Sequence, residues 1–192
     1  MKVPFTGMAM ATLAILAAPS LAGASEAVWN LLRSGGHIVI MRHTLTTPGA
    51  GDPAGFRLED CATQRNLSDT GREDARRIGA AFRSRGIPVA RVLSSPWCRC
   101  LETARLAFGR AETWTALNNL HGDRRREPEQ MRALREVAGQ RPADGNLVLV
   151  THGSVVLPLT GIHPVSGEFL VLAPEPGGRF RVAGRLAPDA VR

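Results

Sequence analysis

Residues 37–43 read HIVIMRH. The first five form a short apolar run rich in β-branched side chains, which is typical of a strand buried on both faces. Arg42 and His43 follow directly at the carboxyl end of this predicted strand. Gly35-Gly36 precedes it and marks the end of a helix that the apolar pattern predicts over residues 25–34. The stretch therefore predicts a buried strand that carries two polar side chains at its end.

Two later segments have the same character. Residues 90–93 form a second apolar strand pattern, followed by Ser94-Ser95-Pro96, with Arg99 three residues further on. Residues 146–150 form a third, followed by Thr151-His152-Gly153. Each of the three predicted strands thus ends in residues that can bind or react.

Helical patterns separate these strands. The predicted helices cover residues 68–86, 97–108 and 129–138, and Ser68 is a natural N-cap for the first. Shorter strand patterns cover residues 112–117, 169–172 and 180–182, and the last two form a hairpin. Alternating strands and helices predict an α/β fold, a three-layer α/β/α sandwich around a mainly parallel central sheet.

Ligands bind such sheets beyond the carboxyl ends of the strands. We therefore expect Arg42, His43, Arg99 and His152 to converge at one edge. Arginine offers phosphate a forked pair of donors, and a histidine kept neutral by neighbouring positive charge can attack phosphorus. The second histidine can donate a hydrogen bond to the phosphoryl oxygens as charge develops on them.

Length and composition narrow the class of protein. The chain has 192 residues, 44% hydrophobic and 21% charged, which fits one globular domain with a processed tail. The net charge is +7, but the arginines are scattered apart from Arg124-Arg125-Arg126, and aromatic residues are only 5%. We therefore expect no nucleic-acid partner. No apolar run approaches the roughly 20 residues of a membrane span, so we expect no stable membrane insertion. The oligomeric state is not predicted.

The first 24 residues have the pattern of a secretory signal peptide. Lys2 supplies the positive start, residues 8–18 the apolar core, and Ala22-Gly23-Ala24 the small residues of a cleavage site. The alternative is a buried N-terminal helix. Cleavage would leave a single domain, residues 25–192, in the periplasm or outside the cell.

Export changes the interpretation of the three cysteines. In an oxidising compartment, the simplest arrangement is one disulfide and one spare thiol. Cys98 and Cys100 are too close in a helix to pair easily, so Cys61 is expected to pair with one of them. Three unpaired buried thiols are the alternative.

Four motifs in order resemble the histidine phosphatase superfamily, the phosphoglycerate-mutase-like fold. IVIMRH at residues 38–43 resembles its Arg-His signature strand, and LSDTGREDA at residues 67–75 is similar to its helix-start motif. SSPWCRCLETA at residues 94–104 is similar to its arginine motif, and VLVTHG at residues 148–153 to its second-histidine strand. The resemblance covers roughly residues 36–160, and no large inserted cap domain is present.

The resemblance implies a role for each matching residue. His43 is implied as the phosphorylated nucleophile of a metal-independent phosphomonoesterase. Arg42, Arg99 and His152 are implied to form its phosphate pocket. No metal or organic cofactor is expected, and the ligand is a small phosphorylated substrate or inorganic phosphate. The resemblance also favours Cys98 over Cys100 as the partner of Cys61.

The sequence departs from the family pattern at two places that concern the pocket. Thr44 stands where a glycine usually follows Arg-His, and we expect its side chain to narrow the pocket. The general acid is not evident, because Asn119 follows Leu117-Asn118 where relatives often have a glutamate. Asp123 is our candidate acid, with Glu127 as the alternative.

If no acid exists, the leaving group must be an activated one, such as that of a phosphoramidate or acyl phosphate. Arg57 and Arg65 are secondary candidates for substrate binding: Arg57 lies within the glycine- and proline-rich segment at residues 44–62, a long predicted loop, and Arg65 follows it closely. Two other functions stay open: a non-catalytic protein that binds a phospho-ligand in the same pocket, and an envelope protein whose arginines face anionic lipid or polysaccharide.

Overall fold

The structure of the protein is a computed structural model that describes residues 21–191. Its helices are α1 (Leu21–Arg33), α2 (Asp69–Ser84), α3 (Cys98–Phe108), α4 (Glu127–Ala138) and α5 (Gly153–Thr160). Its strands are β1 (Ile38–Arg42), β2 (Val89–Ser94), β3 (Glu112–Thr113), β4 (Asn146–Thr151), β5 (Phe169–Glu175) and β6 (Arg179–Leu186). Three short 3₁₀ turns are η1 (Cys61–Thr63), η2 (Thr115–Leu117) and η3 (Pro188–Ala190).

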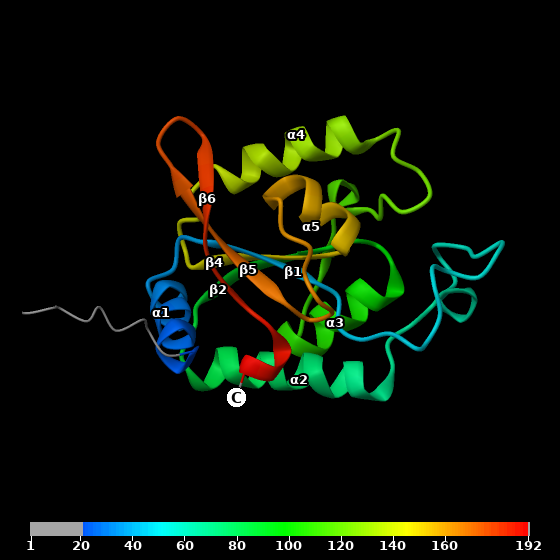
Figure 1. Ribbon diagram of the computed structural model, residues 1–192, viewed down its shortest axis with the longest axis horizontal. Helices are drawn as coiled ribbons and strands as arrows, with labels where there is room; N and C mark the ends of the chain where they lie inside the picture. The colour runs from blue at the N-terminus through cyan, green and yellow to red at the C-terminus, as the bar shows by residue number, and fades with distance from the viewer. Residues whose placement is uncertain (1–20, 192) are drawn as a thin grey trace, which may run out of the picture.

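The six strands form one sheet in the order β3-β2-β4-β1-β5-β6 (Figure 1). The pairs from β3 to β1 are parallel, and β5 and β6 continue the sheet as an antiparallel hairpin. The predicted α/β fold with a mainly parallel central sheet is confirmed. Because β1 and β4 lie in the middle, the ends of the two histidine-bearing strands are neighbours.

Helices cover both faces of the sheet. Figure 1 shows α4 and α5 on one side and α2 and α3 on the other. Alternate residues of β1 face the two layers: Val39 and Met41 pack with α1, α2 and α3, and Ile38 and Ile40 pack with α4 and α5. All four side chains are fully buried, so the continuous apolar run reflects a strand covered on both faces.

The sequence signals for most elements match the structure. Ser68 caps α2, and its side chain accepts a hydrogen bond from the Gly71 backbone N–H, as expected for an N-cap. The predicted strand over residues 112–117 is shorter, because only β3 is extended and η2 follows at once. Helix α5 was not predicted: Pro158 and its β-branched residues are poor helix formers, and the helix is stabilised by burial of Val155 and Val156.

The predicted signal peptide lies largely outside the described residues. Its last residues fall within α1, which begins at Leu21. Among residues 25–33 of this helix, for which burial is described, Val28, Trp29 and Leu32 are buried. Within residues 21–191, no helix is both long and apolar enough to cross a membrane.

Candidate active site

Strand register brings the two histidines together. Strands β1 and β4 are parallel with Arg42 opposite Thr151, so the next residues, His43 and His152, leave the sheet side by side. The backbone N–H of His43 donates to the Thr151 carbonyl over 2.9 Å, and the two imidazole rings are 5.5 Å apart between centroids. Both rings are almost fully buried at the carboxyl edge of the sheet.

The environment of His43 keeps its imidazole ring neutral. Its Nδ1 lies 2.9 Å from the Thr44 carbonyl oxygen, which can only accept, so Nδ1 carries the proton and Nε2 keeps its lone pair. Burial, together with the positive charges of Arg99, Arg42 and Arg65, lowers the pKa of His43 to about 3, although the Thr44 hydrogen bond opposes the shift. His43 is therefore uncharged at neutral pH.

His152 is held by residues at the end of β2 and the start of α3. Ser95 Oγ lies 2.9 Å from its Nε2, and the Cys100 sulfur lies 3.5 Å from the same atom. Burial is the main cause that holds the pKa of His152 well below its ordinary value, and His43 and the arginines add to it. Burial also raises the pKa of the Cys100 thiol to about 12, so Cys100 is a protonated neighbour rather than a second nucleophile.

Arg99 is fixed by a buried carboxylate. Its Nη1 and Nη2 donate to the two oxygens of Asp52 over 2.7 and 3.2 Å. Arg99 stands in the first turn of α3, and Asp52 belongs to the long segment between β1 and α2. The pair lies 47 residues apart in the sequence, and both side chains are almost fully buried.

Two further arginines complete a cationic group. Arg42 donates from Nη1 to the Pro164 carbonyl over 3.0 Å, and Arg65 donates from Nη1 to the Gly49 carbonyl. The Nε atoms of Arg42, Arg65 and Arg99 are all buried, and none has a hydrogen-bond partner among the described residues. Each guanidinium is thus anchored at a terminal nitrogen and keeps an unused Nε–H donor, which an anionic ligand can satisfy.

These side chains line a cavity of about 260 Å³. Its lining residues are Arg42, His43, Gly51, Arg65, Arg99, Asn119, His121, His152, Gly153, Ser154, Leu157 and His163. One part is cationic and contains the two buried histidines. The rest is lined mainly by Asn119, His121, Ser154, Leu157 and His163, with no Asp or Glu among the described residues that line it.

The structure brings most of the candidate site residues together. Arg42, His43, Arg99 and His152 line one cavity, and the secondary candidate Arg65 joins them. These are five of the seven residues that the sequence proposed. The convergence follows from the topology, because all three strand ends open at the same edge.

The other two candidates lie elsewhere. Arg57 does not line the cavity: its side chain is 59% exposed and paired with Asp60. Asp123 does not line the cavity either. Its side chain is exposed, and its carboxylate is paired with Arg125 over 2.8 Å. The hydrogen bond from Arg125 lowers the pKa of Asp123 to about 2. Glu127 is paired in the same way with Arg124.

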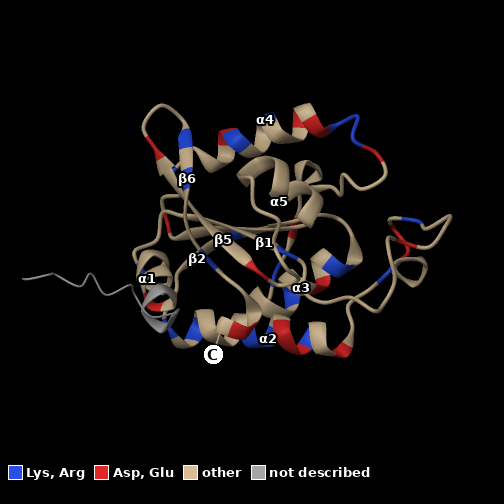
Figure 2. Ribbon diagram, in the orientation of Figure 1, with Lys and Arg blue, Asp and Glu red and all other residues tan. Residues whose placement is uncertain are grey.

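The position of Asp123 explains this pairing. It lies in the loop that precedes α4, where an acidic position is followed by a basic stretch (Figure 2). Opposite charges that are close in sequence pair with each other on this exposed loop, and Asp123 contacts Arg125 rather than lining the cavity. The three arginines that follow Asp123 in the sequence already indicated that this carboxylate would find a partner close by.

Several cavity residues were not proposed from the sequence. Asn119 accepts hydrogen bonds from Ser154 Oγ, over 2.7 Å, and from the His121 backbone. His121 and His163 line the cavity but belong to loops with no recognisable motif. Asp52 sits in a glycine- and proline-rich segment, and no local pattern marks it as the partner of an arginine.

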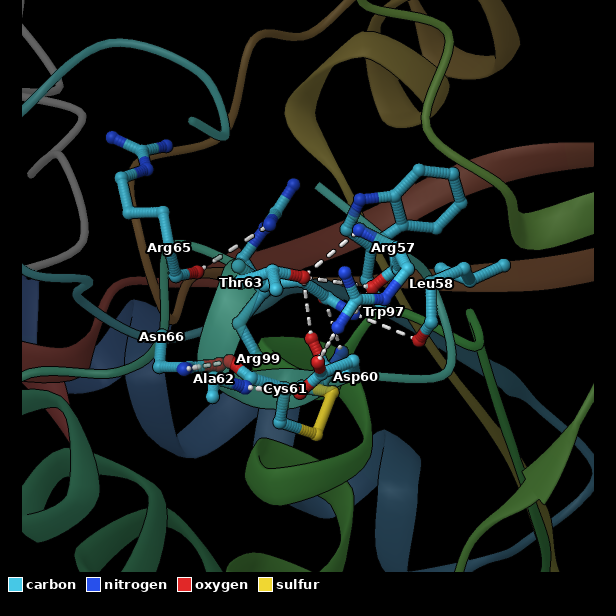
Figure 3. Close-up of a disulfide and its surroundings, with 12 residues drawn as sticks. Arg57, Leu58, Asp60, Cys61, Ala62, Thr63, Arg65, Asn66, Trp97 and Arg99 are labelled. Atoms are coloured by element: carbon cyan, nitrogen blue, oxygen red, sulfur yellow. Dashed lines mark hydrogen bonds and ion pairs between the residues drawn. A yellow bond between two sulfur atoms is a disulfide. The ribbon is translucent and has the colours of Figure 1, made fainter. Parts of the chain in front are cut away.

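A disulfide ties the long loop to the helix that carries Arg99. Cys61 and Cys98 are bonded, with 5.7 Å between their Cα atoms, and Cys100 is a buried free thiol (Figure 3). The expectation of one disulfide and one spare thiol is confirmed, with Cys98 as the partner. Figure 3 shows Arg57 turned toward Asp60 on the same loop.

Thr44 does not narrow the cavity. Its backbone N–H and hydroxyl both lie 3.2 Å from the Thr103 hydroxyl of α3, so the side chain is buried against that helix. It is absent from the cavity lining. The expectation that this residue narrows the pocket is therefore wrong, because a buried hydroxyl partner holds the side chain elsewhere.

Comparison with known proteins agrees with this geometry. A family model, that of the histidine phosphatase superfamily (branch 1), matches residues 38–127, which run from β1 to the start of α4. This part of the chain is therefore similar to the histidine phosphatase superfamily. The match includes the Arg42-His43 strand and the Arg99 motif, and the second histidine follows on the neighbouring strand β4.

Solved histidine phosphatases share the fold. The protein histidine phosphatase SixA, complexed with tungstate, superposes with a TM-score of 0.54 at 18% identity, over 81% of this chain and 99% of its own. Phosphoserine phosphatase from Entamoeba histolytica, in complex with 3-phosphoglyceric acid, gives 0.58 at 12% identity over the same shares. No curated protein gives a significant sequence match. At these identities the likeness shows the fold alone.

Proposed function

We propose that this protein is a metal-independent phosphatase that hydrolyses a phosphomonoester through a phosphohistidine on His43. One observation carries the proposal. Three buried Nε–H donors, of Arg42, Arg65 and Arg99, have no hydrogen-bond partner within residues 21–191, and they lie around a histidine whose proton is held on Nδ1. This is the donor set that a phosphoryl group needs, next to a free imidazole lone pair.

The proposed reaction has two steps. His43 Nε2 attacks phosphorus, a P–N bond forms, and the bond to the leaving oxygen breaks with its electron pair on that oxygen. Water then attacks phosphorus, the P–N bond breaks with its electron pair on Nε2, and inorganic phosphate leaves. Arg42, Arg99 and His152 stabilise charge on the phosphoryl oxygens in both steps. In sum one water is consumed, and one of its protons is found on the leaving alcohol.

The source of that proton decides the substrate class. Asp123 would need a loop movement and a broken Arg125 pair to reach the leaving oxygen. No carboxyl lines the cavity among the described residues, which favours leaving groups that need no enzymic acid. A phosphoramidate such as phosphohistidine, or an acyl phosphate, is therefore our second candidate substrate, and SixA is by name a protein histidine phosphatase.

The first experiment measures hydrolysis of p-nitrophenyl phosphate by residues 25–192 in EDTA. We expect turnover in the wild type and its loss, by a factor of about 10³ or more, in His43→Ala. His37→Ala is the matched control, since His37 directly precedes the same strand at its opposite end and lines no part of the cavity. Equal activity of His43→Ala and wild type would contradict the proposal, and phosphate binding without turnover would leave the binding-protein alternative.

A second measurement separates the substrate classes. If no acid assists the leaving group, kcat/KM should fall steeply from p-nitrophenyl phosphate to an alkyl phosphate, while phosphoramidate stays a good substrate. A flat dependence on the leaving group would show that an acid is present. In that case Asp123→Asn tests the candidate from the sequence, with Glu127→Gln beside it.

We also propose that the protein is exported and that the mature chain begins at Ser25. The signal-like pattern of residues 1–24 and the Cys61–Cys98 disulfide support this location. The buried face of α1 is retained after such cleavage, because Val28, Trp29 and Leu32 follow it. A mass measurement on protein from the periplasmic fraction checks the start, and an intact N-terminus in the cytoplasm would contradict it.

A further inference from the structure

Asp52 is a buried charge that the proposed reaction does not use. Its side chain is 5% exposed and lies in the segment between β1 and α2. It accepts four hydrogen bonds: from Nη1 and Nη2 of Arg99, from the Trp97 indole over 3.2 Å, and from the Arg65 backbone N–H over 3.1 Å. One carboxylate therefore contacts three residues around the cationic end of the cavity.

Asp52 accepts hydrogen bonds from only one edge of the Arg99 guanidinium, so the other edge is free of Asp52. Asp52 occupies the end formed by Nη1 and Nη2, so the edge formed by Nε and Nη2 keeps its outward N–H groups. Arg99 Nε is buried and has no partner among the described residues. A forked donor pair of this kind matches two oxygens of a phosphate.

Asp52 is not placed to give up a proton. Burial raises the pKa of its carboxyl, but the hydrogen bonds from Arg99, the Arg65 backbone and Trp97 outweigh burial and bring it below the ordinary value. The carboxylate is thus charged and fully occupied by donors at neutral pH. It also does not line the cavity.

We propose that Asp52 is a positioning residue: it holds Arg99 by one edge of the guanidinium so that the other edge meets the phosphoryl group. The inference rests on the proposed function and adds a specific residue to it. The Cys61–Cys98 bond and the hydrogen bond from the Cys98 backbone to Gln64 Oε1 fix the loop to the first turn of α3. Asp52 and Arg99 are therefore anchored to each other through the chain as well as directly.

The direction in which phosphate affinity changes when Asp52 is neutralised distinguishes a positioning role from a purely electrostatic effect. Asp52 is a negative charge beside a site for an anion, so its neutralisation alone should tighten phosphate binding. If Asp52 acts by aiming Arg99, its neutralisation should weaken phosphate binding instead. The two explanations predict opposite changes.

The test measures binding of inorganic phosphate to residues 25–192 by calorimetry at pH 7. We expect Asp52→Asn to weaken binding about 10- to 100-fold, the scale of a lost hydrogen-bonded charge pair. Asp52→Glu, which keeps the charge but shifts the carboxylate, should weaken binding in the same direction and carries the test if Asp52→Asn does not fold. Asp60→Asn is the matched control, since Asp60 caps η1 in the same loop and does not contact Arg99.

A double variant tests the route through Arg99. Once Arg99→Ala has removed the guanidinium, Asp52→Asn should cause no further loss of phosphate affinity. Unchanged or tighter binding in both single Asp52 variants, or an added loss in the double variant, would overturn the inference. If the wild type itself binds no phosphate, the proposed function fails before this inference is tested, so the two failures are distinguishable.

Discussion

At the scale of single residues, the site depends on a histidine that is neutral because of where it lies. An ordinary histidine has a pKa near 6.5, whereas burial and three arginines lower that of His43 to about 3. The arginines of the proposed phosphate pocket thus also help to keep the proposed nucleophile, His43, unprotonated.

Protonation of His43 should couple folding to pH. Its folded pKa is below its unfolded value, so between about pH 6.5 and 3 the unfolded chain binds more protons and stability falls as pH falls. We expect His43 to account for about 3 kcal/mol of the loss between pH 7 and pH 4. Urea unfolding at both pH values checks this, and His43→Asn should show a smaller difference between them. An equal difference in both proteins would contradict it.

At the scale of elements, α3 presents Arg99 and is positioned by close packing on α2. Gly79 of α2 faces the backbone of Ala107 in α3, and a Cβ built at Gly79 would lie 2.1 Å from the Ala107 carbonyl oxygen. The neighbouring atoms are backbone and cannot rotate away. The helices approach this closely because position 79 has no side chain.

Gly79→Ala should therefore be destabilising, although alanine is the better helix former. Intrinsic propensity alone would stabilise α2 by about 1 kcal/mol, whereas forcing the helices apart costs about 1–3 kcal/mol or more. We expect a lower thermal midpoint and weaker phosphate binding, since α3 carries Arg99. Arg76→Ala, at an exposed position on the same helix, is the control. A higher midpoint for Gly79→Ala would show that the contact relaxes without cost.

At the scale of the whole molecule, the long loop is held to the first turn of α3 by one covalent bond and one buried ion pair. The disulfide joins residues separated by 37 positions, and the Asp52–Arg99 pair joins positions 47 apart. Between them they close the segment that supplies Arg65 to the cavity. The segment contains little regular structure of its own beyond η1.

Reduction of the disulfide should lower stability substantially. Loop-closure entropy for this separation corresponds to about 4 kcal/mol, or a fall in thermal midpoint on the order of 10 °C. Thermal unfolding with and without reductant measures it, and a Cys61→Ala/Cys98→Ala variant should match the reduced protein. Cys100→Ser should keep the reductant effect, since Cys100 is not bonded. A reductant effect that persists in the double variant would contradict the assignment.

Local patterns determined much of this protein. The apolar run before Arg42, the Ser68 cap and the strand before His152 depend on neighbouring residues, so they are visible in the sequence. The rule that ligands bind at the carboxyl ends of parallel strands then placed Arg42, His43, Arg99 and His152 at one edge. The fold class, the proposed nucleophile and most of the residues of the cationic cavity follow from these signals.

Tertiary structure alone decided which charges meet. Asp52 and Arg99 are distant in the sequence, and their pairing depends on how a loop without periodicity packs on α3. The sequence offered Asp123 as an acid, but in the folded chain it is exposed, pairs with Arg125 two residues further on and does not line the cavity. Helix α5 forms against its own local propensity because the sheet buries it. Periodicity and capping act over a few residues, whereas ion pairs and burial depend on distances that only the folded chain sets.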